Sequence, residues 1–440
     1  MAAGKVFVGM SGGVDSSVAA KLLVDAGYDV TGVYMKNWSR DLPGMKCPWA
    51  EDLADAKRVA VELQIDFKVF DFEEEYRERV VEYMVAEYKA GRTPNPDIMC
   101  NQEVKFKLFF EMAMEQGADF IATGHYARVS EPTSPSHPRA QKMSYAGDSD
   151  ESRQEYTFSE LDGETMIRKS GSEMVRAHLL RAVDEKKDQT YFLYRVSGEA
   201  LSRTIFPIGD LMKSEVRGLA EKWGLATAKK KESMGVCFVG NVGLREFLSE
   251  YVPKKFGEIR DVKTDEVVGE HDGAIFFTIG QRHGLNIGGG LPYYVTRKDM
   301  ERNIVYVSTD LNERGLWRKE VELQRVHWII SEPTSSSHPR AQKMSYTSDS
   351  IESRQEYTFS ELDGEIMTRK SDSEMVQDDP RIFKAQVRVR HQAPLVWAEV
   401  EVVGEEEVVV RFEEEQRAMT AGQSVVIYDG EVCLGGGIIS

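Results

Sequence analysis

A short loop near the start of the 440-residue chain combines glycine, serine and aspartate in a way that suits phosphate binding. It runs from Ser11 to Ser17, follows the apolar run Lys5–Met10 and precedes the helical pattern Val18–Leu23. Glycines let backbone N–H groups close around phosphate oxygens, and a helix N-terminus adds partial positive charge. The loop has neither the Gly-Lys-Ser/Thr of a Walker loop nor the G-x-G-x-x-G of dinucleotide-binding proteins. Simple helix capping by serine and aspartate is the alternative explanation.

Two further segments place cysteine in surroundings that could make it reactive. In the segment Gly91–Asn101, two prolines stiffen a loop that carries Asp97 and Cys100. Their three-residue spacing can place a general acid or base beside a nucleophile. Cys237 follows closely after three consecutive lysines, whose charge favours the reactive thiolate. Each has a structural alternative, since Cys100 could be a buried thiol and Cys237 a small residue in an apolar strand.

Strand and helix patterns alternate over residues 1–205, which predicts a parallel sheet covered by helices, with ligands at the carboxyl ends of the strands. The expected elements are strands at Val6–Met10, Val30–Met35, Phe67–Phe72 and Phe120–Thr123, and helices at Glu51–Leu63 and Glu73–Lys89.

The rest of the chain predicts two more domains. Residues 206–272 have a mixed pattern with helices expected at Lys213–Ala220 and Leu244–Leu248, and form a small central domain. Short alternating strands with Gly-rich turns then predict a β-barrel, or a sandwich, over residues 273–440. Its expected strands are Ile304–Ser308, Glu320–Ile330, Ile382–Arg390, Ala398–Val403, Glu407–Phe412, Ser424–Tyr428 and Val432–Ile439. The predicted fold class is α/β with these two appended domains.

Residues 130–175 and 331–376 are two copies of one 46-residue sequence that differ at only 7 positions. Two copies with unrelated sequence between them do not make a stacked array of repeats. They are rich in Ser, Glu, Arg, Asp and Pro, and cannot bury enough apolar surface to offset the entropy of ordering. We therefore expect disordered insertions at two hairpin tips, where long loops are tolerated. A pair of functional binding modules is the alternative.

The net charge of −17 argues at first against a nucleic-acid partner. The two copies supply −8 of it, however, which leaves −9 for the remainder. There is no apolar run of about 18 residues to span a membrane, and the first strand follows Met1 too closely for a signal peptide. Four cysteines without a C-x-x-C pair indicate neither a disulfide scaffold nor a zinc site, so we expect a cytoplasmic protein with no bound structural metal.

Together these segments resemble the tRNA-specific 2-thiouridylases, a family of PP-loop ATP pyrophosphatases. The Ser11–Ser17 loop is similar to the loop with which such enzymes bind ATP, cleave it between the α and β phosphates and transfer AMP to a substrate oxygen. Gly91–Asn101 is similar to the most distinctive segment of the family, and Gly235–Phe238 also matches. Further matches are Lys187–Leu193, Thr278–Arg282 and Gly430–Ile439. The resemblance covers almost the whole chain outside the two copies.

The resemblance implies an adenine-nucleotide α-hydrolase-like first domain and a role for each matching residue. ATP would be held by Gly9, Met10, Ser11, Gly12, Gly13, Val14, Asp15, Ser16, Met35 and Gly124. Asn95, Pro96 and Asp97 would meet the target base beside the nucleophile Cys100, with Asp97 as candidate acid or base, and Cys237 would carry a persulfide. tRNA would contact His125, Lys187, Asp188, Gln189, Arg390, His391 and Gln423. His391 stands where the family has tyrosine.

The reaction that the resemblance implies is 2-thiolation of the wobble uridine of tRNA at position 34. Adenylation of the C2 oxygen turns a poor leaving group into AMP, with Mg²⁺ neutralising the pyrophosphate. The persulfide sulfur of Cys237 then attacks C2, and Cys100 releases that sulfur and forms a disulfide with Cys237, which needs the two Cα atoms within about 7 Å. The base must first leave its stack.

The partners implied are tRNA and a persulfide-donating protein. Two alternatives remain: another ATP pyrophosphatase, such as an amidotransferase or ligase, and a nucleotide-regulated RNA-binding protein without catalysis. The last has no use for both Cys100 and Cys237. Cys47 and Cys433 are expected to be structural.

Overall fold

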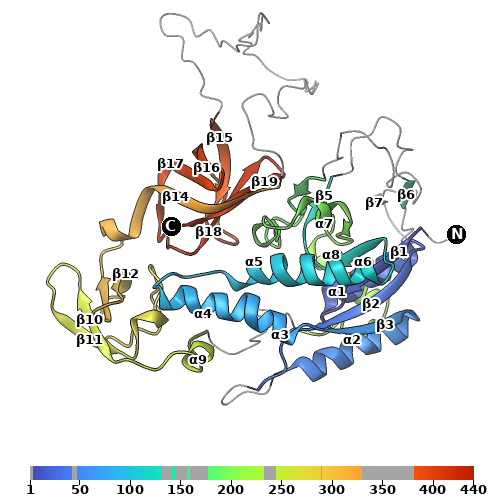
Figure 1. Ribbon diagram of the computed structural model, residues 1–440, viewed down its shortest axis with the longest axis horizontal. Helices are drawn as coiled ribbons and strands as arrows, with labels where there is room; N and C mark the ends of the chain where they lie inside the picture. Colours follow the sequence, from blue (N-terminus) through green and yellow to red (C-terminus); the bar gives the residue numbers. More distant parts are fainter. Residues whose placement is uncertain are drawn as a thin grey trace, which may run out of the picture.

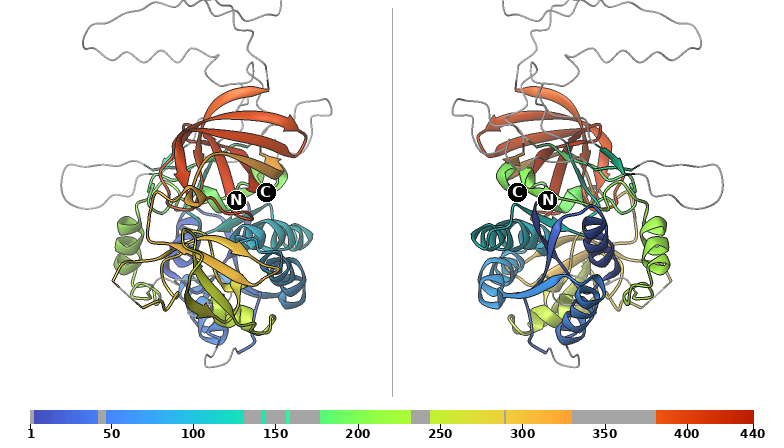
Figure 2. Two further views of the ribbon diagram at one scale, coloured as in Figure 1. Left: turned by 90° about the vertical axis from the view of Figure 1, so that its left-hand side faces the viewer. Right: turned by 90° about the vertical axis from the view of Figure 1, so that its right-hand side faces the viewer.

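A computed structural model describes residues 3–41, 47–130, 141–143, 156–158, 177–231, 244–288, 290–329 and 381–440. Its sheets form three parts of the molecule (Figure 1). In both views of Figure 2 the orange and red strands of the C-terminal barrel lie at one end of the molecule and the blue N-terminal sheet at the other. The predicted fold class is confirmed.

The N-terminal part is a five-stranded parallel sheet in the order β3-β2-β1-β4-β9. Its strands are β1 (Lys5–Gly9), β2 (Asp29–Lys36), β3 (Asp66–Asp71), β4 (Phe120–Thr123) and β9 (Thr204–Ile205). Val6, Phe7 and Val8 have no exposed surface, as expected for a central strand covered on both faces. The first four strands and the alternation with helices were predicted correctly.

Helices α1 (Val14–Asp25) and α2 (Trp49–Leu63) connect the first three strands, and α8 (Lys213–Lys222) packs on α1. A long helical segment comprises α3 (Glu73–Tyr76), a π-helical turn η1 (Arg77–Val81) and α4 (Glu82–Lys89). A second one, running back beside it, comprises α5 (Pro96–Cys100), the π-helical η2 (Asn101–Leu108) and α6 (Phe109–Glu115) (Figure 1). Shorter helices are η3 (Thr190–Phe192) and α7 (Gly198–Ser202). No helix in the described ranges is long and apolar enough to cross a bilayer.

The central part is a four-stranded sheet in the order β11-β10-β13-β12. Its elements are α9 (Leu244–Ser249), β10 (Gly257–Asp261), β11 (Val267–His271), η4 (Ala274–Phe276), β12 (Tyr294–Asp299) and β13 (Ile304–Ser308). The prediction that Ile304–Ser308 is a barrel strand was wrong, because Val305 and Val307 pack with Ile259 and Val295 of this sheet. The alternating pattern predicted a strand at Ile304–Ser308 correctly, but such a pattern does not specify which strands pair with it.

The C-terminal part is a closed barrel in which each strand pairs with two others, in the cyclic order β14-β17-β16-β15-β18-β19. After η5 (Arg314–Leu316) come β14 (Trp317–Trp328), β15 (Ile382–Arg388), β16 (Val396–Gly404), β17 (Glu407–Arg417), β18 (Ser424–Asp429) and β19 (Val432–Ile439). Two strands from the first half of the chain, β5 (Arg128–Val129) and β8 (Leu179–Leu180), extend this sheet beyond β19.

The two copies of the 46-residue sequence enter different kinds of connection. The first separates β5 and β8, which pair antiparallel, so the predicted hairpin tip is confirmed there. The second separates β14 and β15, which pair with other strands, so the prediction of a hairpin tip was wrong there. Adjacent apolar strands in sequence suggested a hairpin, but closure of the barrel places two strands between them.

Within the first copy the structure describes only β6 (Gln141–Met143) and β7 (Tyr156–Phe158), which pair antiparallel. Nearly all of the rest lies outside the described residues, and the disorder of the copies stays a prediction. The predicted domain limits at 205 and 272 do not coincide with the sheets, because α8 packs on α1 of the N-terminal part and β12 and β13 belong to the central sheet.

Joining Ser130 to Ala177 through an Asn-Gly turn should leave the protein folded with equal or higher thermal stability. The Ser130 N–H already donates to the His178 carbonyl at 2.9 Å, and the His178 N–H donates to the Ser130 hydroxyl at 3.0 Å. A shorter loop also lowers the entropic free-energy cost of loop closure by about 2 kcal/mol. The same two-residue turn between Ile329 and Arg381 should prevent folding, because β14 and β15 are not neighbours. Thermal unfolding of both deletions checks this; equal tolerance at the two sites would contradict it.

Candidate functional site

The Ser11–Ser17 loop connects β1 to α1 at the carboxyl edge of the sheet, next to the end of β4. Chain connections reverse direction between β1 and β4, which is where doubly wound sheets bind ligands. Gly12 has φ +73°, and a Cβ there would lie 2.3 Å from the carbonyl oxygen of Asp52. A Cβ on Gly124, just after β4, would lie 2.7 Å from the Ser16 nitrogen. Only glycine allows these two close backbone approaches.

The polar side chains of the loop do not cap α1. Gly13 is the N-cap residue, and no side chain accepts a hydrogen bond from the helix end. Instead the Ser16 hydroxyl accepts from the Ser11 N–H at 3.2 Å, and the Ser17 hydroxyl donates to the Gly13 carbonyl at 2.8 Å. The serines therefore shape the loop and leave the helix N-terminus to an anion, which disfavours the capping explanation.

Asp15, in the first turn of α1, is held by two residues that the sequence patterns did not single out. The ammonium group of Lys213 lies 2.8 Å from both carboxylate oxygens, and the Tyr126 hydroxyl donates to one of them at 2.9 Å. Thr227 similarly donates to the Ser17 hydroxyl at 2.9 Å. These partners come from more distant parts of the chain, so no local spacing could have revealed them.

The remaining residues predicted to hold ATP lie around the same edge. Met10 is buried in the core, whereas Met35 at the end of β2 is half-buried and its methyl group would be 2.9 Å from a Cβ on Gly9. All ten predicted residues therefore end β1, β2 or β4, or begin α1. The cradle fits a polyphosphate. Mg²⁺ commonly binds to phosphate oxygens and one or two carboxylates, and Asp15 is a carboxylate of this loop that would ligate such an ion, whose charge would neutralise the phosphates.

The second predicted segment forms α5 and the loop before it. The Asn95 side chain accepts a hydrogen bond from the Asp97 N–H at 3.1 Å, and Pro96 occupies the first helical turn, where its missing N–H costs nothing. Asn95 and Asp97 are half-buried, whereas Pro96 is buried. The sequence thus builds a short capped helix that holds the predicted base-binding residues.

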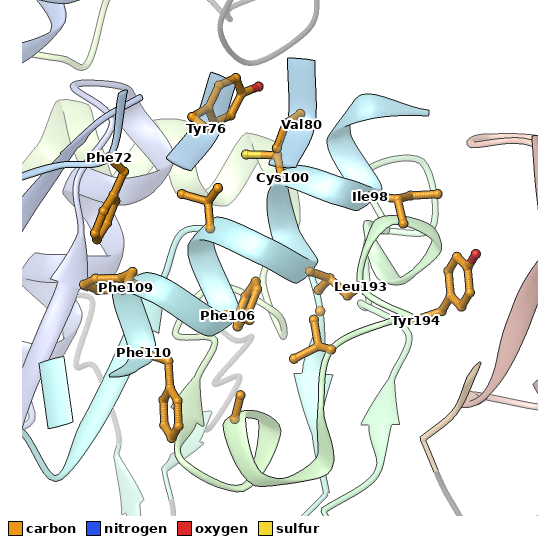
Figure 3. Packing of buried hydrophobic residues seen from close by; sticks show 14 of the residues in the cluster. Phe72, Tyr76, Val80, Ile98, Cys100, Phe106, Phe109, Phe110, Leu193 and Tyr194 are labelled. Atoms are coloured by element: carbon orange, nitrogen blue, oxygen red, sulfur yellow. The ribbon is translucent and has the colours of Figure 1, made fainter. Parts of the chain in front are cut away.

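Cys100 ends this helix inside the hydrophobic core. Its side chain is fully buried in the same cluster as Tyr76, Val80 and Phe106 (Figure 3). The structure therefore places it as a buried thiol, so attack on another sulfur atom needs α5 to move. Cys237 lies outside the described residues, and its pairing with Cys100 stays a prediction.

The other two cysteines fit the structural role expected of them. Burial raises the pKa of the Cys47 thiol, and neighbouring acidic groups, Asp41 first, add to this effect. Burial also raises the pKa of Cys433, a barrel residue without exposed surface. Both shifts disfavour the reactive thiolate form, although a hydrogen bond from the Trp49 backbone opposes the shift at Cys47.

Of the residues predicted to contact tRNA, Asp188 and Gln189 point into the protein. Asp188 forms a buried ion pair with Arg388 of β15 at 2.5 Å, and their side chains are 0% and 5% exposed. Asp188 also accepts from the Ala182 N–H and the Thr190 hydroxyl. The Gln189 side chain accepts from the Tyr126 N–H at 2.9 Å. Lys187 is half-buried. This segment joins the α/β part to the barrel.

Arg390, His391 and Gln423 lie together on the barrel, on the side of α5. The Arg390 guanidinium donates to the Gln423 side chain at 3.2 Å and to the Ala418 carbonyl. The His391 ring packs on Phe192, with centroids 4.4 Å apart. Burial lowers its pKa, Arg388 and Lys187 lower it further, and Asp188 and Asp97 oppose them. His391 is therefore within electrostatic reach of Asp97 in the predicted base-binding segment.

His125 is placed differently from the rest of this set. Its ring is buried between Phe106 and Phe206, and Nδ1 lies 2.7 Å from the Thr123 hydroxyl. Burial lowers its pKa well below the usual value, and Lys105 adds to this. The ring is neutral and is not presented at the surface, so the geometry gives no support to a direct contact with RNA.

Comparisons with known proteins agree on one family across the three parts. Family models match residues 4–241 (tRNA methyl transferase HUP domain), 245–309 (tRNA methyl transferase PRC-barrel domain) and 367–439 (aminomethyltransferase beta-barrel domain). The fold and the loop after β1 thus define a PP-loop protein of the HUP class with two appended β domains.

Similar full-length proteins give the family more narrowly. The tRNA-specific 2-thiouridylases MnmA of Bacillus subtilis and Halalkalibacterium halodurans are 38% and 40% identical over 436 residues, which is 99% of this chain and 94% of each relative. That of Streptococcus thermophilus is 40% identical over 440 residues, 99% of this chain and 95% of its own. The chain belongs to the tRNA-specific 2-thiouridylase family.

Among solved structures, NMN synthetase of Francisella tularensis matches 28% of this chain and 44% of its own at 20% identity, with a TM-score of 0.20.

Replacing Gly124 by alanine should weaken ATP binding at least tenfold, about 1.4 kcal/mol. The new Cβ would sit 2.7 Å from the Ser16 nitrogen and 2.8 Å from the Asp15 carbonyl carbon, and would push the loop away. Titration calorimetry with a non-hydrolysable ATP analogue measures the effect. Gly218→Ala in α8, where the Cβ meets nothing within 4 Å, is the control and should keep full affinity. Wild-type affinity in folded Gly124→Ala would contradict the expectation.

Asp188→Ala should lower the free energy of unfolding by about 3 kcal/mol, since it leaves Arg388 charged and buried without its partner. Lys187→Ala should change it by less than about 0.5 kcal/mol. Urea unfolding of the two variants makes the comparison. An Asp188→Ala protein as stable as Lys187→Ala would mean that the carboxylate does not hold the two parts together.

Proposed function

We propose that this protein converts the wobble uridine of tRNA, at position 34, to 2-thiouridine with consumption of ATP. The observation that carries the proposal is the 38–40% identity to tRNA-specific 2-thiouridylases over 99% of the chain. It is supported by a glycine-built cradle at the carboxyl edge of the sheet, which suits the phosphates of ATP. It is also supported by the short distance in sequence between Asn95, Asp97 and Cys100 on one capped helix.

In the first step, the uridine C2 oxygen attacks the α-phosphate of ATP and pyrophosphate leaves. The loop amides of Ser11–Ser17 and the N-terminus of α1 bind the charge of the polyphosphate, and Lys213, bonded to Asp15, places a cation beside the loop. The uridine is now bonded through oxygen to AMP, which is a good leaving group.

In the second step, the outer sulfur of a persulfide on Cys237 attacks C2 and AMP leaves, so that C2 is bonded through that sulfur to Cys237. The Cys100 thiolate then attacks the Cys237 sulfur, and the S–S bond breaks. The sulfur stays on C2 as the thiocarbonyl group, and Cys100 and Cys237 form a disulfide. A thiol reductant and a persulfide-donating protein return the enzyme to its starting state.

The order of these steps can be tested with three cysteine variants, using tRNA transcript, ATP, Mg²⁺ and polysulfide as the sulfur source. Cys237→Ser should form no 2-thiouridine but still release pyrophosphate, because adenylation precedes sulfur transfer. Without reductant, Cys100→Ser should accumulate a covalent tRNA–protein adduct that dithiothreitol releases.

Cys47→Ser is the matched control, since a serine can keep the contact of the Cys47 sulfur with the Trp38 carbonyl, now 3.8 Å long. It should retain activity. Nucleoside mass spectrometry detects the product and gel shift the adduct. Thiolation at the normal rate by Cys237→Ser would exclude the persulfide role, and absence of 2-thiouridine with the unmodified protein would exclude the function.

A further inference from the structure

The loop that leads into α5 is the point where all three parts of the molecule meet. The Thr93 N–H donates to the Ala421 carbonyl of the barrel at 2.8 Å. The Thr93 hydroxyl lies 3.5 Å from that of Thr278, which follows the η4 helix of the central part. On the other side, Arg92 bonds to Glu87 of α4 through two contacts of 2.6 and 2.7 Å. The loop before Cys100 is thus held by each part.

The barrel contributes one segment to this junction, residues 418–423 between β17 and β18, which we call the strap. Internal bonds stiffen it: the Thr420 hydroxyl donates to the Ala418 carbonyl at 3.2 Å, and the Gln423 N–H to the Thr420 carbonyl at 3.1 Å. The Gly422 N–H is tied to the Ile439 carbonyl of β19 at 2.9 Å. A displacement at one end of so short and bonded a segment therefore shifts the other end.

Gly422 is the strap residue whose backbone contacts the loop before α5. It has φ +90°, and a Cβ there would lie 2.9 Å from the Thr93 nitrogen and 3.0 Å from Arg92 Cβ and the Thr93 carbonyl carbon. The two backbones are in direct contact, with no side chain between them. A movement of the strap toward or away from the loop must therefore move Thr93, two residues before the cap of α5.

Both ends of the strap are bonded to Arg390. The guanidinium donates to the Ala418 carbonyl and to the Gln423 side chain, the latter at 3.2 Å. A phosphate would compete for this guanidinium, because it is charged as well and can accept two parallel N–H bonds, whereas the present acceptors are neutral. An anion on Arg390 would thus release both ends of the strap at once.

We propose that the strap is a positioning element, which couples occupancy of Arg390 and Gln423 by a polyanion to the position of α5 and so to the exposure of Cys100. Cys100 has no exposed surface, and its chemistry requires α5 to shift. The Thr93–Ala421 hydrogen bond and the Gly422 contact transmit a movement of the strap to the loop before α5, and so to α5 itself. The identity of the polyanion as tRNA rests on the proposed function, but the coupling does not.

The coupling can be measured without turnover by the rate at which iodoacetamide alkylates each cysteine, resolved by peptide mass spectrometry. Gly422→Ala should speed alkylation of Cys100 at least fivefold and leave the barrel residue Cys433 unchanged. Gly430→Ala is the matched control, because Gly430 also has a positive φ (+58°) but open space around it. It should leave Cys100 unchanged. Equal Cys100 rates in the two variants would overturn the proposal, and so would a parallel increase at Cys433.

Arg390→Met provides a second, independent variant in case Gly422→Ala does not fold. It removes both bonds to the strap and should raise the Cys100 rate at least threefold, again without change at Cys433; an unchanged rate counts against the proposal. Adding tRNA to the unmodified protein should raise the Cys100 rate, but should have no further effect in Arg390→Met. If the variants behave as expected and tRNA has no effect, the coupling stands and the proposed ligand is wrong.

Kinetics distinguish positioning from simple loss of stability. In the thiolation assay, Gly422→Ala should change kcat at least fivefold while the KM for ATP stays within twofold, since the cradle lies at the β1–α1 connection and the strap lies between β17 and β18 of the barrel. A rise in the KM for ATP together with unchanged kcat would contradict a role in positioning α5.

Discussion

The buried ion pair between Asp188 and Arg388 is the interaction on which the arrangement of the whole molecule depends. Two charges without access to water are tolerated only when geometry and further hydrogen bonds compensate for desolvation. Here the Ala182 N–H and the Thr190 hydroxyl donate hydrogen bonds to the Asp188 carboxylate. The Thr190 hydroxyl also contacts the Tyr428 hydroxyl of the barrel. A residue of the α/β part is therefore fixed against the barrel wall. The position of Arg390 and the strap over α5 follows from that contact.

The candidate site combines a rigid half with a shielded half. The cradle after β1 is built from backbone approaches that glycine alone permits, so it is pre-organised for phosphate before any ligand arrives. The thiol of Cys100, by contrast, is in the core. In the proposed reaction, such an arrangement separates activation of the uridine at the cradle from exposure of the Cys100 thiol. A protected thiol is also less open to adventitious oxidation, which depends on thiolate character and access.

Local patterns predicted the local elements well and the long-range partners poorly. The apolar runs of β1 to β4 and the helix Glu73–Lys89 were predicted, because their signals lie within a few residues. The prediction that Asp97 and Cys100 lie on a loop was wrong, since both belong to helix α5. The sheet to which Ile304–Ser308 belongs and the strands that pair with β14 could not be predicted, because strand pairing is decided by how the whole sheet closes. For the same reason the ion pair of Asp188 with Arg388, 200 residues away, could not be predicted, and the RNA contact that the resemblance implies for Asp188 stays a prediction. The contacts of Lys213 and Tyr126 with Asp15 could not be predicted either, since both residues lie far from Asp15 in the sequence.

The pairing of β8 with β19 has a consequence for how the chain acquires its structure. These strands are separated by about 250 residues, and contacts of such sequence separation form slowly because the loop between them must close first. During synthesis the β5–β8 hairpin has only itself to pair with until the end of the barrel appears. Its outer edge is then an open strand edge, of the kind that invites pairing with other chains. The hairpin in the first half of the chain therefore gains its covering strand only when the last strand of the barrel has been made.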